Sequence, residues 1–505
     1  MKKASSRLIF ISLVFIAIEG MLLADSGRMM ADPWPVLDSY RELELRGYIS
    51  LQPNVWPLRS GRMLDALPEK PADIASKLWI EELKHCLSVA LIKNDTIGII
   101  FEPGIDGILN NPRDPDDRFY PKMRLGGGMA KDPVEGFVSY EVNLRWAREE
   151  NFRGRQWSGF AGRPDQVYLR VDGDDWGVQF GRDYLVWGEG LILGNAHAPF
   201  DRIDYQIDIG RFRFSGFSGW LDPIYCRRDF GDTLIWELSQ RYLSGHRMEY
   251  LSKHFSIALH EIILYGGFGR SFEGIYTVPL YWFHAQQLNL GLDDNTFVGG
   301  DVQLLFPPVR LSCEFLVDDI QVEAKTQGDE EPPEIAIAAQ ADYGLTVFDK
   351  WLTLSARYEG VTNWTYNQIR YWNKYIYLND PLGSYLGNDA DIGSFKLKFM
   401  ANPKLIIDIE AFYLRKGEGR IEAIWSEPWM DIEGEYTEPF PSGIVEKTSG
   451  LKLCYEGNFR PFLFCNVGFE YGWVQNYLHE PEKKSDYWKF EFGLSGSLYK
   501  DIKIK

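Results

Sequence analysis

The sequence is poor in cysteine and histidine and has no excess of positive charge. It contains 5 cysteines and 7 histidines in 505 residues. The cysteines show neither CxxC spacing nor the density of a disulfide framework, which argues against zinc sites and thioredoxin-type chemistry. Lysine and arginine total 54 against 72 acidic residues, a net charge of -18. The chain therefore lacks the clustered positive charge of a nucleic-acid-binding protein, and we expect no such partner.

Long hydrophobic runs are also scarce. The run LIFISLVFIAI (residues 8–18) follows Lys2, Lys3 and Arg7 and is too short to span a bilayer comfortably. It is typical of a secretory signal peptide, which we assign to residues 1–24 with cleavage near Ala24. No cysteine lies near the cleavage region, which argues against a lipid-anchored lipoprotein.

Helical spacing is confined to the next part of the chain. In the stretch PADIASKLWIEELKHCLSVALIK, Pro71 stands near the first helical position, and Ile74, Leu78 and Leu83 follow near helical spacing. We therefore predict a small helical module over residues 25–95.

From about residue 96 to residue 505 the hydrophobic period changes to two. In VRLSCEFLVDD (residues 309–319), Leu311, Cys313 and Phe315 alternate with Ser312 and Glu314, as in a strand with one apolar face. Similar alternation is predicted from Val138 through Trp146, and residues 166–182 read as a hairpin turning at GDD.

No amphipathic helices accompany these segments, and aromatic residues reach 15% of the chain. A soluble β-sandwich is one interpretation. A large antiparallel transmembrane β-barrel explains both the aromatic outer face and the charged inner one, and about 16 to 18 strands would fit the available length. Together with the signal peptide, this predicts export to the outer membrane of a Gram-negative-type cell, with outer-membrane lipid as one partner.

The stretch GRDYLVWGEGLILGNAHAPFDRI (residues 181–203) interrupts the alternation. Its glycines allow sharp bends or a close approach of another chain segment. A flat ring and several hydrogen-bonding groups lie close together in it, which suits a polar, ring-shaped ligand such as a sugar. A bulged strand followed by a tight loop, with the tryptophan simply packed, is the alternative. The candidate ligand-binding residues here are Arg182, Trp187, Glu189, Asn195, His197 and Asp201.

Several motifs, taken in their order along the chain, resemble the Wzi-type capsule-assembly family. In the central stretch the resemblance lies in a Gly-Arg start, a Trp-Gly-x-Gly core and an Asn-Ala-x-Pro-Phe ending, with Glu189 standing where the family tends to have proline. The other matching segments are HRMEY (246–250), ALHEIILYGG (258–267), DNTFVGGDV (294–302), FLVDDIQ (315–321), EGVTNWTYN (359–367) and NDPLGSYLGNDAD (379–391).

This resemblance implies an outer-membrane barrel with a periplasmic helical module that binds surface, or capsular, polysaccharide without catalysis. We expect no cofactor and no metal, because the acidic turns at residues 114–117 and 172–175 complete no EF-hand pattern. We also expect a monomer. An acidic polymer would need local positive charge, for which Arg202, Arg211 and Arg213 are the nearest supply.

Three alternatives stay open at this point. His246, Arg247 and Glu249 either bind a ligand or form a lumen-side network that holds strands in register. A diffusion porin would share the barrel, the charge and the aromatic girdles. A glycan hydrolase would need paired carboxylates, for which Glu189 with Asp201, or Asp294 with Asp301, are candidates.

Cys454 and Cys465 flank a predicted turn at equal distances from its centre, so we expect them to face each other across a hairpin. Cross-strand Cβ atoms lie about 4.5 to 5.5 Å apart, which is long for a disulfide, so strain argues against a bond.

Overall fold

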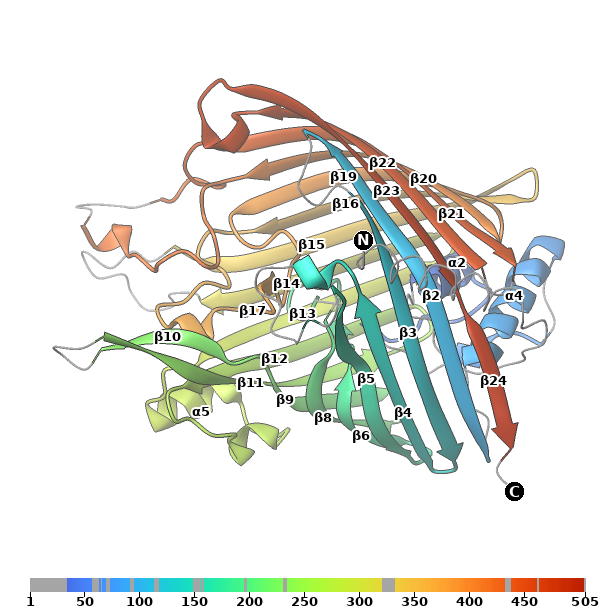
Figure 1. The fold of residues 1–505 in the computed structure, drawn as a ribbon, viewed down its shortest axis with the longest axis horizontal. Coiled ribbons are helices and arrows are strands. Elements are labelled where there is room, and N and C mark those ends of the chain that lie inside the picture. The colour runs from blue at the N-terminus through green and yellow to red at the C-terminus, as the bar shows by residue number, and fades with distance from the viewer. Residues whose placement is uncertain are drawn as a thin grey trace, which may run out of the picture.

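The structure is a computed structural model that describes residues 34–56, 63–64, 66–69, 73–90, 95–112, 118–148, 156, 159–194, 198–229, 234–319, 332–431, 437–460 and 463–503. Most of these residues belong to one antiparallel sheet that closes on itself (Figure 1). The predicted signal peptide lies outside the described residues.

The sheet contains 20 described strands. β9 and β10 share one place beside β11, and β23 and β24 share one place beside β2. The described wall therefore has 18 strand positions (20 - 2), and the pairing of β2 with β3 on one side and β23 on the other closes it. The predicted large antiparallel barrel is confirmed.

The strands of the wall, in chain order, are β2 (Thr96–Asn111), β3 (Arg118–Lys131), β4 (Val134–Asn143), β5 (Ala161–Asp172), β6 (Trp176–Asp183), β8 (Phe200–Ile209), β9 (Phe212–Trp220), β10 (Ile224–Asp229), β11 (Leu234–Leu251), β12 (Phe255–Gly267), β13 (Asn295–Phe306), β14 (Val309–Asp319), β15 (Glu334–Val347), β16 (Lys350–Val361), β19 (Ala390–Asn402), β20 (Leu405–Lys416), β21 (Glu446–Arg460), β22 (Leu463–Gln475), β23 (Lys484–Gly496) and β24 (Leu498–Lys503).

Alternation along the strands produces an apolar outside and a polar inside. In β14, Leu311 and Phe315 are exposed on the outer face, whereas Ser312 and Glu314 are buried on the lumen side. The predicted hairpin is confirmed, since Val171 pairs with Val178 across β5 and β6. The alternation predicted through Trp146 ends earlier, because β4 stops at Asn143 and Trp146 begins the 3-10 turn η1 (Trp146–Arg148).

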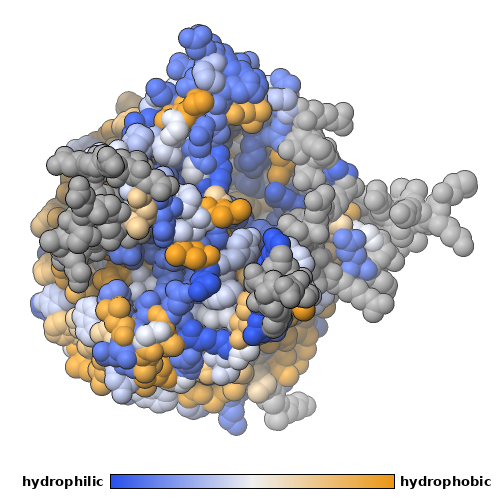
Figure 2. Space-filling view, turned by 90° about the vertical axis from the view of Figure 1, so that its left-hand side faces the viewer, coloured by the Kyte–Doolittle hydropathy of each residue, from blue (hydrophilic) through white to orange (hydrophobic). Residues whose placement is uncertain are grey.

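The two ends of the barrel differ. Strands are joined by short turns at the end where β2 begins, such as those after β5 and β8, and by long connections at the other end. Figure 2 views the end with the long connections, where hydrophilic residues gather toward the centre and hydrophobic residues are concentrated around the lower rim. A transmembrane barrel of the outer-membrane type shows this same asymmetry of short periplasmic turns and long outer loops.

Two described helices, α2 (Trp34–Leu45) and α4 (Ile74–Ala90), lie beside the short-turn end (Figure 1). They share a buried apolar cluster with strand residues at that end, where Trp79 stacks on Trp351 with ring centroids 4.8 Å apart. No described helix combines the length and the apolar character needed to cross a membrane. The helices precede β2, so the domain boundary predicted near residue 95 stays compatible with the fold, and the periplasmic location of the module stays a prediction.

Candidate functional site in the barrel lumen

The stretch predicted to matter most turns into the barrel. β7 (Val186–Trp187) leaves the wall after β6 and pairs with β1 (Val55–Trp56), which belongs to the segment between the helices. The Gly188 N–H donates to the Asn54 carbonyl at 2.9 Å. The N-terminal segment and the predicted loop therefore meet inside the lumen.

Trp187 lies in the middle of an apolar core within the lumen. Its side chain is 1% exposed, and its ring meets Phe217 edge-on with centroids 5.3 Å apart. The same core contains Leu191, Ile192 and Leu193 from the loop. This burial contradicts the expectation that Trp187 offers an open face for stacking a sugar: the loop is hydrophobic after its glycine turn, and burying those residues together removes the ring from solvent.

The turn after Trp187 is built around one buried carboxylate. Glu314, on the lumen face of β14, accepts the N–H groups of Glu189 at 2.6 Å, Leu191 at 3.0 Å and Ile192 at 3.1 Å. Gly188 has φ +64°, and a Cβ there would lie 2.7 Å from the Glu314 carboxylate. Both facts require glycine at this position, so the Trp-Gly-x-Gly core is explained by how the loop docks on the wall.

A second connection, residues 362–389, also turns inward and holds the first. Tyr366 and Tyr375 donate their hydroxyl groups to the carbonyls of Leu191 at 2.5 Å and Ile192 at 2.6 Å. Both tyrosines are fully buried, and this segment carries the two short strands β17 (Ile376–Tyr377) and β18 (Asp380–Pro381). The two inward loops thus form a plug inside the lumen, which packs on the wall from β8 to β16.

A cavity of about 810 Å³ remains beside this plug. It reaches from Tyr40 and Arg41 on α2 to Trp146 and Arg163 at the long-loop ends of β4 and β5. Its lining carries five arginines and four acidic residues, a formal charge of +1 (5 - 4), although the whole chain carries -18. The charged residues of the lining are Arg41, Arg145, Arg163, Arg310, Arg357, Glu44, Asp106, Glu189 and Asp380.

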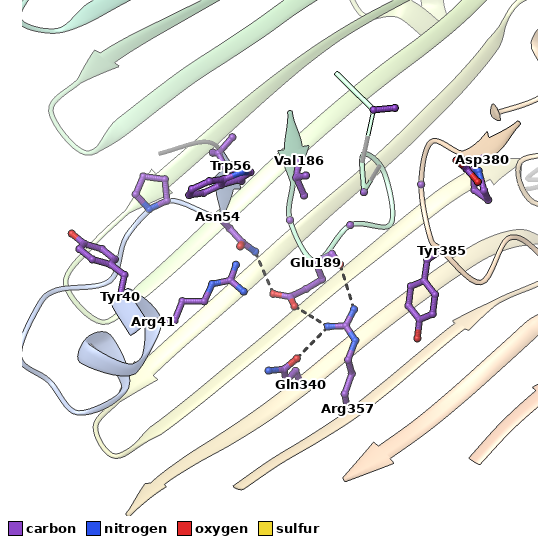
Figure 3. Close-up of a pocket in the computed structure, with 18 of the residues that line it drawn as sticks. Tyr40, Arg41, Asn54, Trp56, Val186, Glu189, Gln340, Arg357, Asp380 and Tyr385 are labelled. Atoms are coloured by element: carbon purple, nitrogen blue, oxygen red, sulfur yellow. Dashed lines mark hydrogen bonds and ion pairs between the residues drawn. The ribbon is translucent and has the colours of Figure 1, made fainter. Parts of the chain in front are cut away.

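Glu189 is the charged centre of this lumen cavity (Figure 3). Its carboxylate accepts hydrogen bonds from Arg357 at 3.0 Å and from the Asn54 side chain at 3.4 Å. Burial alone would raise the pKa of Glu189, but the guanidinium groups of Arg357, Arg41 and Arg310 lower that pKa to about 2. Glu189 is therefore a fixed negative charge, and Arg357 is held in place by it.

Aromatic rings border the same space. Arg163 lies over the Trp146 ring at 4.2 Å from its centroid, a cation–π contact. Tyr385, from the second inward loop, is 70% exposed. In Figure 3 Tyr385 stands on the opposite side of Arg357 from Arg41. Rings next to hydrogen-bonding groups are the features that hold a sugar by its apolar face and its hydroxyl groups.

Arg182 and Asp201 form a pair with each other on the outer face. They are direct neighbours across β6 and β8, and two parallel hydrogen bonds join them at 2.9 and 2.5 Å. Asp201 alternates with Arg202, so Asp201 shares the outer face with Ile203, whereas the buried Arg202 faces the lumen. Arg182 therefore binds the carboxylate of the neighbouring strand.

His246 and Arg247 lie on opposite faces of β11. Arg247 is buried in the lumen, where it forms an ion pair with Asp301 and bonds His260 at 3.1 Å. His246 faces outward and lies 3.2 Å from Glu261. The expected lumen-side network is therefore present around Arg247 but excludes His246, because side chains one residue apart in a strand point to opposite faces.

Of the remaining predicted residues, the three arginines do not line the cavity. Asn195 and His197 lie outside the described residues. Arg211 and Arg213 stand at the short-turn end, where they bond Tyr250 and Asp208. With Arg202 bonded to Asp204 and to the Asp183 carbonyl, these three arginines do not form the basic cluster expected for an acidic polymer.

Neither carboxylate pair proposed for a hydrolase is assembled. Glu189 faces the lumen and binds Arg357, whereas Asp201 binds Arg182 on the outer face. Asp301 is in the lumen with Arg247, and Asp294 is held by Arg270 at 2.9 Å near the outer face. The wall separates the members of each pair.

Arg357, Trp146 and Arg163 were not among the residues predicted for the site. Arg357 points inward from β16 by the same alternation as in the other strands, just before the EGVTNWTYN motif. Arg145 and Trp146 lie at the start of the connection between β4 and β5, and Arg163 lies near the start of β5. The signal in the sequence that could have indicated these site residues was the presence of basic and aromatic residues at the ends of strands.

Comparison with known proteins agrees with this architecture. The family model described as capsule assembly protein Wzi matches residues 138–487. The chain belongs to the Wzi capsule-assembly family. Its closed wall and its family membership together identify this Wzi-family chain as an outer-membrane β-barrel. A comparison with curated protein sequences found no match.

Solved structures with a similar fold include one of Wzi from Escherichia coli, described as an outer membrane protein involved in group 1 capsule assembly and a carbohydrate-binding β-barrel. It is 14% identical, with a TM-score of 0.63 over 95% of this chain and 100% of that one. OccD3 of Pseudomonas aeruginosa is 9% identical with a TM-score of 0.43, covering 81% of this chain and 92% of its own. OccAB1 of Acinetobacter baumannii is 9% identical with a TM-score of 0.46, covering 81% and 98%.

Proposed function

We propose that this Wzi-family chain binds surface polysaccharide in the lumen cavity and helps to attach or organise that polymer on the cell, without catalysing a reaction. The observation that carries the proposal is the cavity itself, which has five arginines and several aromatic rings in its lining and lies beside the plug formed by the two inward loops. The carbohydrate binding described for the E. coli Wzi barrel supports the same reading.

The proposed contacts differ from those expected from the sequence. Tyr385 offers an exposed ring against which the apolar face of a sugar packs. Arg163 and Arg357 supply guanidinium donors for hydroxyl or carboxylate groups. Glu189 orients Arg357 and accepts hydrogen bonds, so of the residues first proposed it is the one that we retain as part of the site.

A diffusion porin is the less favoured function. Trp187, Tyr366 and Tyr375 are fully buried in the lumen core, and Asn54 joins Glu189 and Asp301 across it. This plug occupies the lumen beside the wall from β8 to β16 and so narrows the space left for solutes. We therefore expect planar-bilayer recordings to show no large steady conductance.

Binding of purified capsular polysaccharide to the purified barrel tests the proposal. Arg163→Ala combined with Tyr385→Ala should weaken binding by about fivefold or more for each residue, since a charge-assisted hydrogen bond or an aromatic contact contributes about 1 to 3 kcal/mol. Arg211→Ala combined with Tyr413→Ala is the control. It removes one arginine and one tyrosine side chain as well, but from the short-turn end and the outer wall, and it should leave binding unchanged. Equal binding by both variants would contradict a site in this cavity.

A further inference from the structure

The connection between β12 and β13, residues 268–294, folds over the outside of the barrel. On β12, Phe255, Ile257 and Leu259 are exposed on the outer face, and alternation puts Glu261 and Ile263 on that face as well. Glu261 and Ile263 are nevertheless buried, because the 3-10 turn η2 (Gly274–Thr277) and helix α5 (Phe283–Leu290) cover them. In Figure 1, α5 lies outside the wall, next to β11. We call residues 268–294 the outer-wall segment.

Specific contacts fix the outer-wall segment to the wall. The Glu261 carboxylate accepts the N–H groups of Phe283 at 2.9 Å and His284 at 2.8 Å, which open α5. His284 bonds Thr296 on β13 at 3.0 Å, and the Phe283 ring packs on His246 with centroids 4.5 Å apart. The segment therefore covers polar groups of three neighbouring strands.

The depth of these groups follows from strand geometry. Phe255 belongs to an aromatic band at the short-turn end, where its ring stacks on Tyr250 and the Tyr250 ring meets Phe212. Glu261 is six residues further along β12, or about 16 Å higher at ~3.4 Å per residue and a tilt of ~40°. The apolar band of an outer-membrane barrel is about 25 Å tall. Glu261 and His246 thus fall within the membrane, where an uncovered carboxylate is unfavourable.

The surface that the outer-wall segment turns away from the barrel is apolar. Leu280, Trp282 and Leu288 are 85%, 65% and 67% exposed. No Asp, Glu, Lys or Arg occurs from residue 274 to residue 292, although such residues make up 25% of the chain. The charges at its ends are paired, with Arg270 bonded to Glu273 at 2.7 Å and to Asp294 at 2.9 Å. A surface of this kind facing water would be unfavourable.

We propose that the outer-wall segment lies in the outer leaflet of the membrane, with Leu280, Trp282 and Leu288 inserted among lipid acyl chains. Its inner face covers the Glu261–His246 pair, and its outer face continues the exposed apolar surface of β12 above Leu259. This continuity with the lipid-facing wall is what favours acyl chains over a second copy of the chain as the occupant. It also accounts for His246 as part of the membrane-facing structure rather than of the glycan site.

Depth-dependent fluorescence quenching in liposomes tests this placement. A polarity-sensitive dye is attached at Leu280→Cys, or separately at Leu288→Cys, in a chain whose native cysteines are replaced by alanine. Ile424→Cys is the matched control, because Ile424 is 92% exposed and equally apolar but lies in the long connection after β20. Heat-modifiable migration on gels verifies that each variant folds.

We expect nitroxide attached to lipid acyl chains to quench the dye at 280 and 288 several times more strongly than at 424, and aqueous iodide to show the reverse order. Strong iodide quenching at 280 and 288 would overturn the proposal. Protection from both quenchers would also overturn it, because it would mean that a second copy of the chain covers the segment.

If the chain without cysteines does not fold, a second measurement tests the proposal in a chain that keeps its native cysteines. Brominated lipids quench tryptophans that lie among acyl chains, so Trp282→Phe should remove more of the lipid-dependent quenching than Trp425→Phe does. Trp425 lies in the same long connection as Ile424. An equal change in both variants would contradict insertion of the outer-wall segment.

Discussion

Replacement of Trp187 by alanine should loosen the plug inside the barrel. The ring is 1% exposed, packs edge-on against Phe217, and belongs to a core formed by both inward loops. Its indole N–H has no hydrogen-bond partner among the described residues, so the loss comes from packing alone. Removal of a buried tryptophan costs about 3 to 5 kcal/mol, and the edge-on pair with Phe217 is included in that loss.

Such a loss shifts the folding equilibrium of the core about a hundredfold or more, at ~1.4 kcal/mol per factor of ten. Urea unfolding in detergent, followed by near-UV circular dichroism, would measure it. Trp236→Ala serves as the control, because Trp236 is 68% exposed and its removal should change stability by about 0.5 kcal/mol or less. If Trp187→Ala unfolds at the same urea concentration as the unaltered chain, the lumen core is not packed around this ring.

Three further outcomes follow from the lumen and the cysteines. Asp301→Ala should destabilise the barrel by about 1.5 to 3 kcal/mol in denaturant titrations, because the buried Arg247 loses its closer carboxylate partner and keeps only Glu249 at 3.4 Å; a much smaller loss would show that water reaches this site. Folding lowers the pKa of Glu189 from 4.5 to about 2, so the stability that Glu189 contributes should be complete above about pH 4.5 and should be lost as the pH falls toward 2. Glu189→Gln should therefore flatten the dependence of stability on pH in that window. An unchanged pH dependence would contradict the Glu189–Arg357 contact. Thiol titration of the denatured chain should find at least four free thiols, because Cys226, Cys313, Cys454 and Cys465 form no disulfide bond. A lower count would contradict the observed strand register.

The strand register corrects the expectation for Cys454 and Cys465. Cys454 pairs with Gly468, and Cys465 pairs with Gly457, so the two cysteines do not face each other. The hairpin turns nearer to Cys465 than the predicted turn midway between the two cysteines, with Arg460 opposite Leu463 and a register irregularity after Asn458. Turn position depends on such local irregularities, which alternation along each strand does not reveal.

The barrel was predictable because its physical signature repeats in every strand. Leu311 and Phe315 outside and Glu314 inside illustrate an alternation that is readable from sequence alone. The role of Glu314 was not readable, since it depends on a loop more than a hundred residues earlier whose N–H groups reach it only after the barrel closes. The same holds for Arg357, which becomes a site residue only because Glu189 is folded into the lumen beside it.

Trp187 shows why a motif can indicate the right region and the wrong role. The glycines beside it marked an unusual backbone, and the loop does line the lumen cavity through Gly188, Glu189 and Gly190. The apolar residues Leu191, Ile192 and Leu193 that follow were the signal that this loop packs inward and carries the ring into the core.

Retention of capsular polysaccharide on living cells tests the central claim most directly. Cells that lack their own copy of this protein would express the unaltered chain, the Arg163→Ala and Tyr385→Ala double variant, or the Arg211→Ala and Tyr413→Ala control, each at the same level in the outer membrane. Cell-bound and released polymer are then measured after gentle washing. We predict that the double variant releases most of its polymer while the control retains it. Full retention by the double variant, with the barrel correctly assembled, would contradict a polysaccharide site in the lumen cavity.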